Sequence, residues 1–260
     1  MRLIAVLMLA AGMALPQTPT VTDGGVVNLA SGVPGQPVAP GSLVAIFGSQ
    51  LASSLAAANT IPLSNSLADV TSVTFNGNPV PLQFVSPTQI NAQVPWETGM
   101  GTAAVVVNRG GAASQPVNVQ IAGTAPGIFS LTFAGLQAIA INNGDGSLAA
   151  PAGLVPGLLS HPATAADNLI IYATGLGVVT PAPTTGANSA DTQRTTVIMP
   201  TMMVGGVPAK VSFSGLSPLL VGVYQVNIVM PSGVTPGNNV PLQIQTPDAT
   251  TTDQVTIAVQ

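Results

Sequence analysis

Apolar and polar residues alternate along many short segments of the chain. In residues 224–231, "YQVNIVMP", the apolar side chains alternate with Gln225 and Asn227. Successive side chains of a β-strand point to opposite faces, so this pattern predicts a strand with one buried face. Similar runs rich in Val, Ile, Thr and Phe, bounded by Gly, Pro, Asn and Ser, predict further strands: "SLVAIFG", "SVTFNG", "TAAVVVN", "PVNVQIA", "NLIIYAT", "AKVSFSG", "PLQIQT" and "DQVTIAVQ".

Turn and loop residues separate these segments. Asn76-Gly77 and Gly205-Gly206 predict hairpin turns, because glycine readily adopts the positive φ that such turns require. The chain has 24 prolines, which disfavour long helices. Only residues 51–59, "LASSLAAAN", have helix propensity, and we expect a short turn or helix there within a loop.

The sequence contains an internal repeat. "QINAQVP" at 89–95 returns as "QVNIVMP" at 225–231. Other matches follow in the same order: "IFGSQL" with "IYATGL", "FNGNPVP" with "VGGVPAK", and "VNVQIA" with "VTIAVQ". The matches predict an internal duplication of roughly 110 to 135 residues. We interpret the Gln/Asn phrase as the same structural strand in each copy, and as scaffold rather than an active site.

The pattern predicts an all-β fold of two tandem immunoglobulin-like β-sandwich modules. About seven short strands per copy, with turn signals every 8 to 12 residues, are typical of that sandwich. We place the first module at 15–123 and the second at 124–260. "GIFSLTF" and "LQAIAIN" predict strands directly after the boundary. The two modules then have almost no free linker, which favours a fixed angle between them.

The first residues, "MRLIAVLMLAAGMALPQ", have the pattern of a secretory signal peptide. Arg2 precedes an apolar run, and the small residues Gly12 and Ala14 follow it. We expect residues 1–14 to be removed and the protein to be secreted, extracellular or at the cell surface. No internal stretch approaches the roughly 20 apolar residues of a membrane-spanning helix. The chain has no cysteine, so its stability depends on packing without disulfides.

Charge is scarce in this sequence. The chain is 47% hydrophobic and only 5% charged, against about 25% charged in ordinary domains. Beyond the signal peptide, three basic residues stand against eight acidic ones. A basic patch for nucleic acid or anionic lipid is therefore not expected. With few titrating groups, the stability of the fold should depend weakly on pH.

Candidate catalytic residues are few. The chain has no Cys nucleophile, and its one histidine, His161, lies in "LLSHPAT" with no motif around it. A general base needs a positioned nucleophile and a group that orients it, so we interpret His161 as a solvated loop residue. No phosphate loop, dinucleotide fingerprint or zinc spacing is present. We expect a non-enzymatic protein without a cofactor.

One turn sequence has the oxygen ligands of a metal loop. In "NNGDGS", Asn143, Asp145 and Ser147 offer alternating oxygens like the start of a calcium loop. The twelfth position of such a loop, where a bidentate Glu is needed, is Leu154. Asn-Gly and Asp-Gly are also common turn dipeptides. We favour a plain turn and keep metal binding as the alternative.

Aromatic residues make up only 3% of the chain. Trp96, beside Glu97 in "VPWETG", is the sole Trp and the best candidate for stacking against a sugar. Burial is the usual fate of such a ring, so we favour a Trp packed over the end of a sandwich or between modules. The following residues are expected in the core of the second module: Tyr172, Tyr224, Met199, Met202, Met203 and Met230.

Several segments together resemble a known family. They are "VVNLASGVPGQPVAPGSLVAIFGSQLA", "VTFNGNPVPLQFVSPTQINAQVPWETG", "PGIFS", "QAIAINNGDGS", "IIYATGLGVVTP" and "GVYQVNIVMPSGVTPG". In this order they resemble the Solibacter-type uncharacterised C-terminal domain of secreted acidobacterial proteins. Each half also resembles, more loosely, the IPT/TIG class of immunoglobulin-like domain. The resemblance implies export and an immunoglobulin-like fold, and it brings no catalytic residues with it.

The sequence favours a role in adhesion, extracellular matrix or cell-surface assembly. The expected partner is an extracellular protein or a polysaccharide, or a second copy paired through sheet edges that carry little charge. The alternative is a carbohydrate-binding module that uses an exposed Trp96. A hydrolase that depends on His161 or on a pair of carboxylates is the least favoured hypothesis.

Overall fold

A computed structural model describes residues 18–132, 136–251 and 255–260. This part of the chain is built from strands and loops and has no helix, so the prediction of an all-β fold is confirmed. No helix in it is long and apolar enough to cross a membrane. The predicted signal peptide lies outside the described residues.

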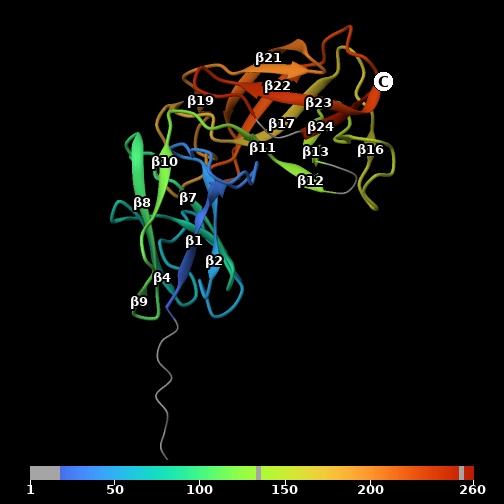
Figure 1. The fold of residues 1–260 in the computed structure, drawn as a ribbon. Helices are drawn as coiled ribbons and strands as arrows, with labels where there is room; N and C mark the ends of the chain where they lie inside the picture. The colour runs from blue at the N-terminus through green and yellow to red at the C-terminus, as the bar shows by residue number, and fades with distance from the viewer. Residues whose placement is uncertain (1–17, 133–135, 252–254) are drawn as a thin grey trace, which may run out of the picture.

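The N-terminal strands form two sheets that face each other (Figure 1). One sheet has the order β1-β2-β7-β6-β3, and the other has the order β10-β8-β4-β5 with β9 paired to β8. The strands are β1 (Thr20–Asn28), β2 (Leu43–Ser49), β3 (Ala56–Ala57), β4 (Val70–Phe75), β5 (Asn78–Pro79), β6 (Leu82–Val85), β7 (Gln89–Gln93), β8 (Gly101–Arg109), β9 (Ala112–Ala113) and β10 (Val117–Ile121).

The C-terminal strands form a continuous network in the order β12-β13-β24-β23-β20-β21-β22-β17-β14-β15-β16. Strand β21 joins two layers, because its start pairs with β20 and the rest pairs with β22. The strands are β11 (Gly127–Ile128), β12 (Ser130–Thr132), β13 (Leu136–Ala138), β14 (Ala140–Asn142), β15 (Leu148–Ala149), β16 (Ser160–His161), β17 (Asn168–Thr174), β18 (Val179–Thr180), β19 (Thr195–Thr196), β20 (Thr201–Val204), β21 (Val207–Leu216), β22 (Tyr224–Val229), β23 (Gly237–Gln245) and β24 (Val255–Val259).

Each group of strands encloses its own hydrophobic core. The N-terminal core draws on residues between 21 and 121, and the C-terminal core on residues between 128 and 259. In β22 buried and half-buried residues alternate without a break, as the sequence pattern predicts for a half-buried strand. We call the two groups, β1–β10 and β11–β24, the N-terminal and C-terminal modules.

The repeated sequence segments pair in the same register in both modules. Strand β2 pairs with β7 through Ile46 opposite Ile90. The matching strands β17 and β22 pair through Ile171 opposite Val226. In each case the two residues are the ones that the sequence matches align. The repeated phrase is therefore one structural strand used twice.

An isolated parallel bridge also recurs. Val38 is bridged to Ile121 in the N-terminal module, and Ala163 is bridged to Val259 in the C-terminal module. Both bridges connect a loop segment to the last strand of their module, and both carry backbone hydrogen bonds of 2.8 to 3.0 Å. The predicted boundary at residue 124 falls between β10 and β11, and its use as a folding boundary stays a prediction.

Both predicted hairpin turns are present. Asn76 and Gly77 have φ of 49° and 81°, and Gly205 and Gly206 have φ of 56° and 82°. Two successive positive φ angles are typical of the turn that matches the twist of two hairpin strands.

Two details of the prediction are wrong. Residues 51–59 form bends and the short strand β3, which pairs with β6, and no helix. A helix of nine residues is marginal without tertiary support, and this segment finds its backbone partners at the edge of a sheet. The modules also have more strands than the seven or so expected, since several strands consist of two or three residues.

Candidate functional site

The C-terminal module has an aromatic and amide face on the side of β17, β21 and β22 that points away from its core. Tyr172 lies opposite Gln225, and Phe213 lies opposite Asn227. Directly paired residues of antiparallel strands share a face of the sheet. Gln225 Nε2 donates a hydrogen bond of 2.9 Å to Asn227 Oδ1. We call these four residues the C-terminal row.

The position of Tyr172 corrects the prediction that it belongs to the core. Along β17 the residues Leu169, Ile171 and Ala173 are buried, while Tyr172 is only half-buried. The alternation therefore places Tyr172 on the outer face. Tyr224, in contrast, is fully buried as predicted, and burial raises the pKa of its phenol well above the ordinary value.

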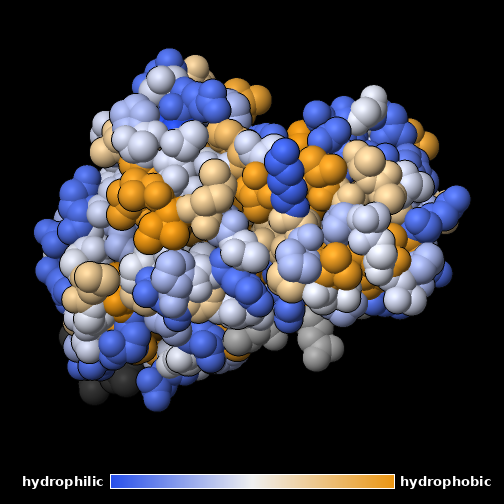
Figure 2. Space-filling model, turned by 90° about the horizontal axis from the view of Figure 1, so that it is seen from above, coloured by the Kyte–Doolittle hydropathy of each residue, from blue (hydrophilic) through white to orange (hydrophobic). Residues whose placement is uncertain are grey.

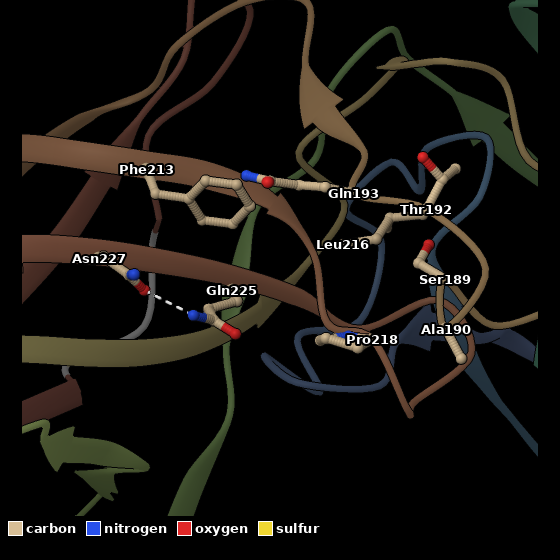
Figure 3. A pocket seen from close by; sticks show the side chains of 9 residues that line it. All are labelled: Ser189, Ala190, Thr192, Gln193, Phe213, Leu216, Pro218, Gln225 and Asn227. Atoms are coloured by element: carbon tan, nitrogen blue, oxygen red, sulfur yellow. Dashed lines mark hydrogen bonds between the residues drawn. The ribbon is translucent and has the colours of Figure 1, made fainter.

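A cleft of about 470 Å³ lies beside this row. Figure 3 shows the amide of Gln193 reaching the ring of Phe213, with Gln225 and Asn227 below the ring and Ser189 toward the other end. None of the nine residues that line the cleft is charged. The site therefore offers a ring face, amides and hydroxyls, with no group that titrates near neutral pH.

One hydroxyl group at the cleft has no hydrogen-bond partner. Ser189 is only 5% exposed, and its Oγ is both buried and unpartnered among the described residues. A buried hydroxyl without a partner is costly, by about 1–3 kcal/mol. Ser189 Oγ is thus a buried polar atom of the cleft wall, and among the described residues it has no partner.

An ion pair fixes the loop that carries Ser189 and Gln193. Arg194 donates from Nη1 and Nη2 to the two carboxylate oxygens of Asp191, at 2.6 and 3.0 Å. These hydrogen bonds lower the pKa of Asp191 to about 2. Arg194 is 7% exposed, so the guanidinium is packed beneath the loop. The pair holds the wall of the cleft in place.

Trp96, the residue that the sequence singles out, lies between the modules. Its ring packs against the C-terminal core and is tilted against Tyr224, with centroids 6.4 Å apart. Its Nε1 is buried and has no hydrogen-bond partner in the part of the chain that the structure describes. The ring is partly buried rather than exposed, which agrees with the packing that the sequence favours. The alternative, in which Trp96 stacks on a sugar, requires an exposed ring, and the Trp96 ring is packed against the C-terminal core.

Glu97 also belongs to this junction. Thr185 Oγ1 of the C-terminal module donates a hydrogen bond of 2.8 Å to Glu97 Oε2, and it accepts one of 3.1 Å from the Trp96 backbone. A Glu97 carboxylate that is engaged in this way serves to position the β18–β19 loop region.

The fully buried Gln93 connects the same two modules. Its Nε2 donates to Gly41 O at 3.2 Å, and its Oε1 accepts from Gly186 N at 2.7 Å. The Thr174 hydroxyl group accepts a bond of 3.0 Å from Leu43 N and belongs to the opposite module. These bonds support the expected fixed connection between the modules.

Asp145 lies in the turn between β14 and β15. Its Oδ1 accepts hydrogen bonds from the Ser147 backbone and hydroxyl group, at 3.0 and 2.7 Å. Its Oδ2 lies 2.9 Å from Nε2 of His161. Both carboxylate oxygens are therefore used within the protein, as in the plain turn that the sequence favours. The described residues contain no group of three or more His, Cys, Asp or Glu that could hold a metal ion.

The prediction of His161 as a solvated loop residue agrees with the structure in part: the side chain is 42% exposed, but the residue is not in a loop. It lies in strand β16, which pairs in parallel with β15 through Ala149 opposite His161. Its Nδ1 lies 2.9 Å from the Pro162 carbonyl, while Nε2 faces Asp145. Both ring nitrogens face acceptors, so the doubly protonated ring satisfies both.

These contacts shift both pKa values in this pair. The Pro162 carbonyl and then the Asp145 carboxylate raise the pKa of His161 above 6.5. Hydrogen bonds from the Ser147 backbone and hydroxyl group, followed by the one from His161, lower the pKa of Asp145 to about 2. The side chains of His161 and Asp145 are 42% and 45% exposed, so solvent screens the pair.

The methionine prediction is correct in part. Met202 and Met230 are buried, as expected of core residues. Met199 is 55% exposed, and Met203 is half-buried. Met199 is exposed because it lies after β19 in a segment that belongs to no strand.

The family comparison concerns the N-terminal module. Residues 33–121 match the model of the IPT/TIG domain, an immunoglobulin-like class. The match supports the resemblance for the first half of the chain, and the resemblance of the second half to that class stays a prediction. The Solibacter-type resemblance stays a prediction. No curated protein matches the chain.

Comparison with solved structures gives matches that are distant in sequence. The extracellular region of plexin A4 is 13% identical, with a TM-score of 0.30 over 99% of this chain and 20% of that one. SGBP-B of the Bacteroides ovatus mixed-linkage glucan utilization locus is 15% identical, with a TM-score of 0.35 over 87% of this chain and 44% of that one. Surface glycan-binding protein PbSGBP-B of Prevotella bryantii is 13% identical, with a TM-score of 0.30 over 90% and 41%. This chain thus spans less than half the length of each.

Proposed function

We propose that the protein is an exported, non-enzymatic β-sandwich protein that acts in adhesion, extracellular matrix or cell-surface assembly by binding a polysaccharide. The observation that carries the proposal is the uncharged cleft beside the C-terminal row. Its lining combines the ring of Phe213 with the amides of Gln193, Gln225 and Asn227. The proposed role in adhesion or surface assembly is the one that the sequence favours. The proposed site of binding differs, since it is this cleft and not Trp96.

The chemistry of the cleft fits a sugar. The C–H face of a pyranose is apolar and packs on an aromatic ring, while its hydroxyl groups both donate and accept hydrogen bonds. A side-chain amide has both functions as well, and ligand sites typically combine apolar walls with a few placed polar groups. No residue that lines the cleft titrates, so the proposal involves binding without a chemical step.

The test is affinity electrophoresis in gels that contain a neutral β-glucan, a neutral α-glucan, a mannan or acidic alginate. We expect a neutral polymer to retard the protein and Phe213→Ala to abolish the retardation. Lys210→Ala, an exposed residue of the same strand outside the cleft, is the matched control. Because this change alters the net charge, the mobility of each protein is divided by its mobility in a gel without polymer, and this ratio should be the same for the control and the unchanged protein. Retardation that is equal in all three proteins would refute a role for the cleft.

Self-association is a second candidate, and a specific surface favours it. Val178, Val197, Ile198 and Met199 are 48% to 62% exposed, and Val197 N donates to Val178 O at 2.9 Å. Contiguous exposed apolar residues often mark contact surfaces. Figure 2 shows hydrophobic residues in separate groups among polar ones on one face of the molecule.

The sheet edges give less support to pairing between copies. Of the six strands that end the sheet orders, β3, β5, β12 and β16 have only two or three residues each, while β1 has nine and β10 has five. Pairing between copies would therefore have to use β1 or β10. Very short edge strands are one way in which proteins block edge-to-edge pairing. Light scattering over a range of concentrations tests self-association. Self-association is supported if the mass grows with concentration and if the double variant Ile198→Ser, Met199→Ser no longer shows this growth. A mass that stays at the monomer value at all concentrations would exclude it.

A further inference from the structure

The N-terminal module repeats the aromatic and amide row on its own outer face. Phe47 lies opposite Gln89, and Phe84 lies opposite Asn91. In the C-terminal row Tyr172 lies opposite Gln225 and Phe213 opposite Asn227. In each module the glutamine thus lies opposite an aromatic residue of the strand on one side, β2 or β17. The asparagine lies opposite a phenylalanine of the strand on the other side, β6 or β21. We call Phe47, Gln89, Asn91 and Phe84 the N-terminal row.

The correspondence extends to details of the backbone and the side chains. The N-terminal strand has an irregular register between Leu82 and Phe84, and the C-terminal strand has one between Val211 and Phe213. Such a bulge changes which face the following side chain takes. In both rows the glutamine donates to the asparagine of its own strand, at 2.7 Å in the N-terminal row and 2.9 Å in the C-terminal row.

The aromatic residues are concentrated in these rows. The chain has only six Phe, two Tyr and one Trp, and four of them lie in the two rows. Phe47 is 39% exposed, and the other three are half-buried. A sandwich needs polar residues on its outer face but no aromatic ring there. Their recurrence in both modules therefore calls for a reason other than the core.

We propose that the N-terminal row is a second binding site for a neutral polysaccharide, so that one chain holds the polymer at two places. The inference rests on the proposed function of the C-terminal cleft. Both rows offer the same groups at the same cross-strand spacing: two rings flanking two hydrogen-bonded amides. No member of either row is charged, which matches a polymer of uncharged sugars rather than an acidic one.

Because the connection between the modules is fixed, a second site would raise the overall affinity for a polymer. Two sites on one rigid chain convert the second binding event into an intramolecular one, with a gain of about 10²–10⁴ in overall affinity when the geometry fits. A polymer of repeating sugars offers the same epitope many times. We expect a short oligosaccharide to occupy each site independently, because the two rows lie in different modules.

The experiment is titration calorimetry of the full chain, first with the neutral polymer that retards it most in gels and then with a hexasaccharide of that polymer. We expect two hexasaccharides per chain. Phe47→Ala with Gln89→Ala should reduce this number to one, as should Phe213→Ala with Gln225→Ala. Either pair should weaken binding of the polymer by about tenfold or more. Gln120→Ala, an exposed change in the other N-terminal sheet, should alter neither.

The outcomes separate the two proposals. One hexasaccharide per chain, lost only on Phe213→Ala, would overturn the second site and leave the proposed function standing. No heat with any neutral polymer would overturn both. Unchanged far-ultraviolet circular dichroism and unfolding midpoint show that each variant is folded. Phe47 and Gln89 are chosen because neither is buried, so their removal leaves the core intact.

Discussion

At the scale of single residues, the few charges of this protein are engaged in specific pairs. Arg109 Nε donates to Asp69 at 2.7 Å, and its Nη1 donates to the Gln50 carbonyl at 2.8 Å. Arg194 and His161 have the matching pairs in the C-terminal module. The pairs of Arg109 with Asp69 and of His161 with Asp145 each tie a loop to a strand, whereas the pair of Arg194 with Asp191 lies within one loop. In a chain with 5% charged residues, charge serves local positioning rather than a long-range field.

The pair of His161 and Asp145 predicts a small dependence of stability on pH. A raised histidine pKa stabilises the fold fully below the ordinary value of 6.5, and this contribution is lost as pH rises through the raised value. A lowered aspartate pKa stabilises the fold above 3.8, and this contribution is lost as pH falls to about 2. The pair therefore contributes most between about pH 4 and 6.5.

The measurement is the free energy of unfolding in urea at pH 5 and pH 8.5. We expect a slightly lower value at pH 8.5, and His161→Gln should remove that difference. Because the pair is exposed and screened, the change should remain small. A steep change that His161→Gln leaves in place would show that another group is responsible.

A glycine beneath Trp96 gives a second prediction at this scale. Gly41 has φ of +78°, and a Cβ there would lie 2.2 Å from the Trp96 ring. Gly41→Ala should lower the free energy of unfolding by about 2–5 kcal/mol, from backbone strain and overpacking together. Gly77 has φ of +81° and open space around it. Gly77→Ala should therefore cost only the backbone strain, about 1–2 kcal/mol.

Urea unfolding of both variants is the measurement. Equal losses for Gly41→Ala and Gly77→Ala would mean that the Trp96 ring yields without cost, so that the junction is loosely packed.

At the scale of elements, alternation predicted the strands but not which face would meet the core. Tyr172 and Tyr224 both stand in apolar runs of similar pattern, and only the pairing of β17 with β22 and β21 decides that one is outside and the other inside. The hairpin turns were predictable because two residues determine each turn locally. Residues 51–59 were not, since their partners lie in β6, far along the chain.

The candidate site was harder to predict for the same reason. The cleft unites the loop of Ser189 and Gln193 with Phe213 and Gln225, and no local motif joins these segments. Likewise, Asp145 and His161 meet because β15 and β16 pair in parallel. The sequence did contain one usable signal: besides the repeated Gln and Asn, the matched segments "IFGSQL" and "IYATGL" carry an aromatic residue at the same position, Phe47 and Tyr172. The interpretation of the Gln/Asn phrase as scaffold alone passed over this signal, and the proposed binding rows replace that interpretation.

The polar contacts of β7 with the other module give a prediction at the element scale. Gln93→Ala would leave Gly41 O and Gly186 N without their buried partner. We expect a loss of about 1–3 kcal/mol in the free energy of unfolding. Gln120→Ala removes an amide that bonds only to exposed Thr102, and it should cost less than about 0.5 kcal/mol. Urea unfolding of both variants distinguishes a structural junction from an incidental contact.

At the scale of the whole molecule, the two modules lie across each other in Figure 1, with the strands of the N-terminal module running down the view and those of the C-terminal module running across it. Each has its own core, yet Trp96 of one packs on the core of the other. The modules are thus separate in their hydrophobic interiors and joined by the Trp96 ring, by further apolar contacts such as Leu43 beside Gly222, and by a set of buried hydrogen bonds. Such an arrangement fixes the two proposed binding rows relative to each other.

This arrangement predicts how separate fragments behave. Residues 124–260 expressed alone should fold, because their core is complete apart from Trp96. They should unfold at a lower temperature than in the full chain, since the Trp96 ring no longer covers the core near Tyr224 and the Gly186 backbone loses Gln93. Scanning calorimetry of the fragment, the full chain and full-length Trp96→Ala is the measurement. If the fragment unfolds at the temperature of the full chain, the junction contributes nothing to the C-terminal module; if Trp96→Ala in the full chain reproduces most of the decrease, the ring is the main coupling between the modules.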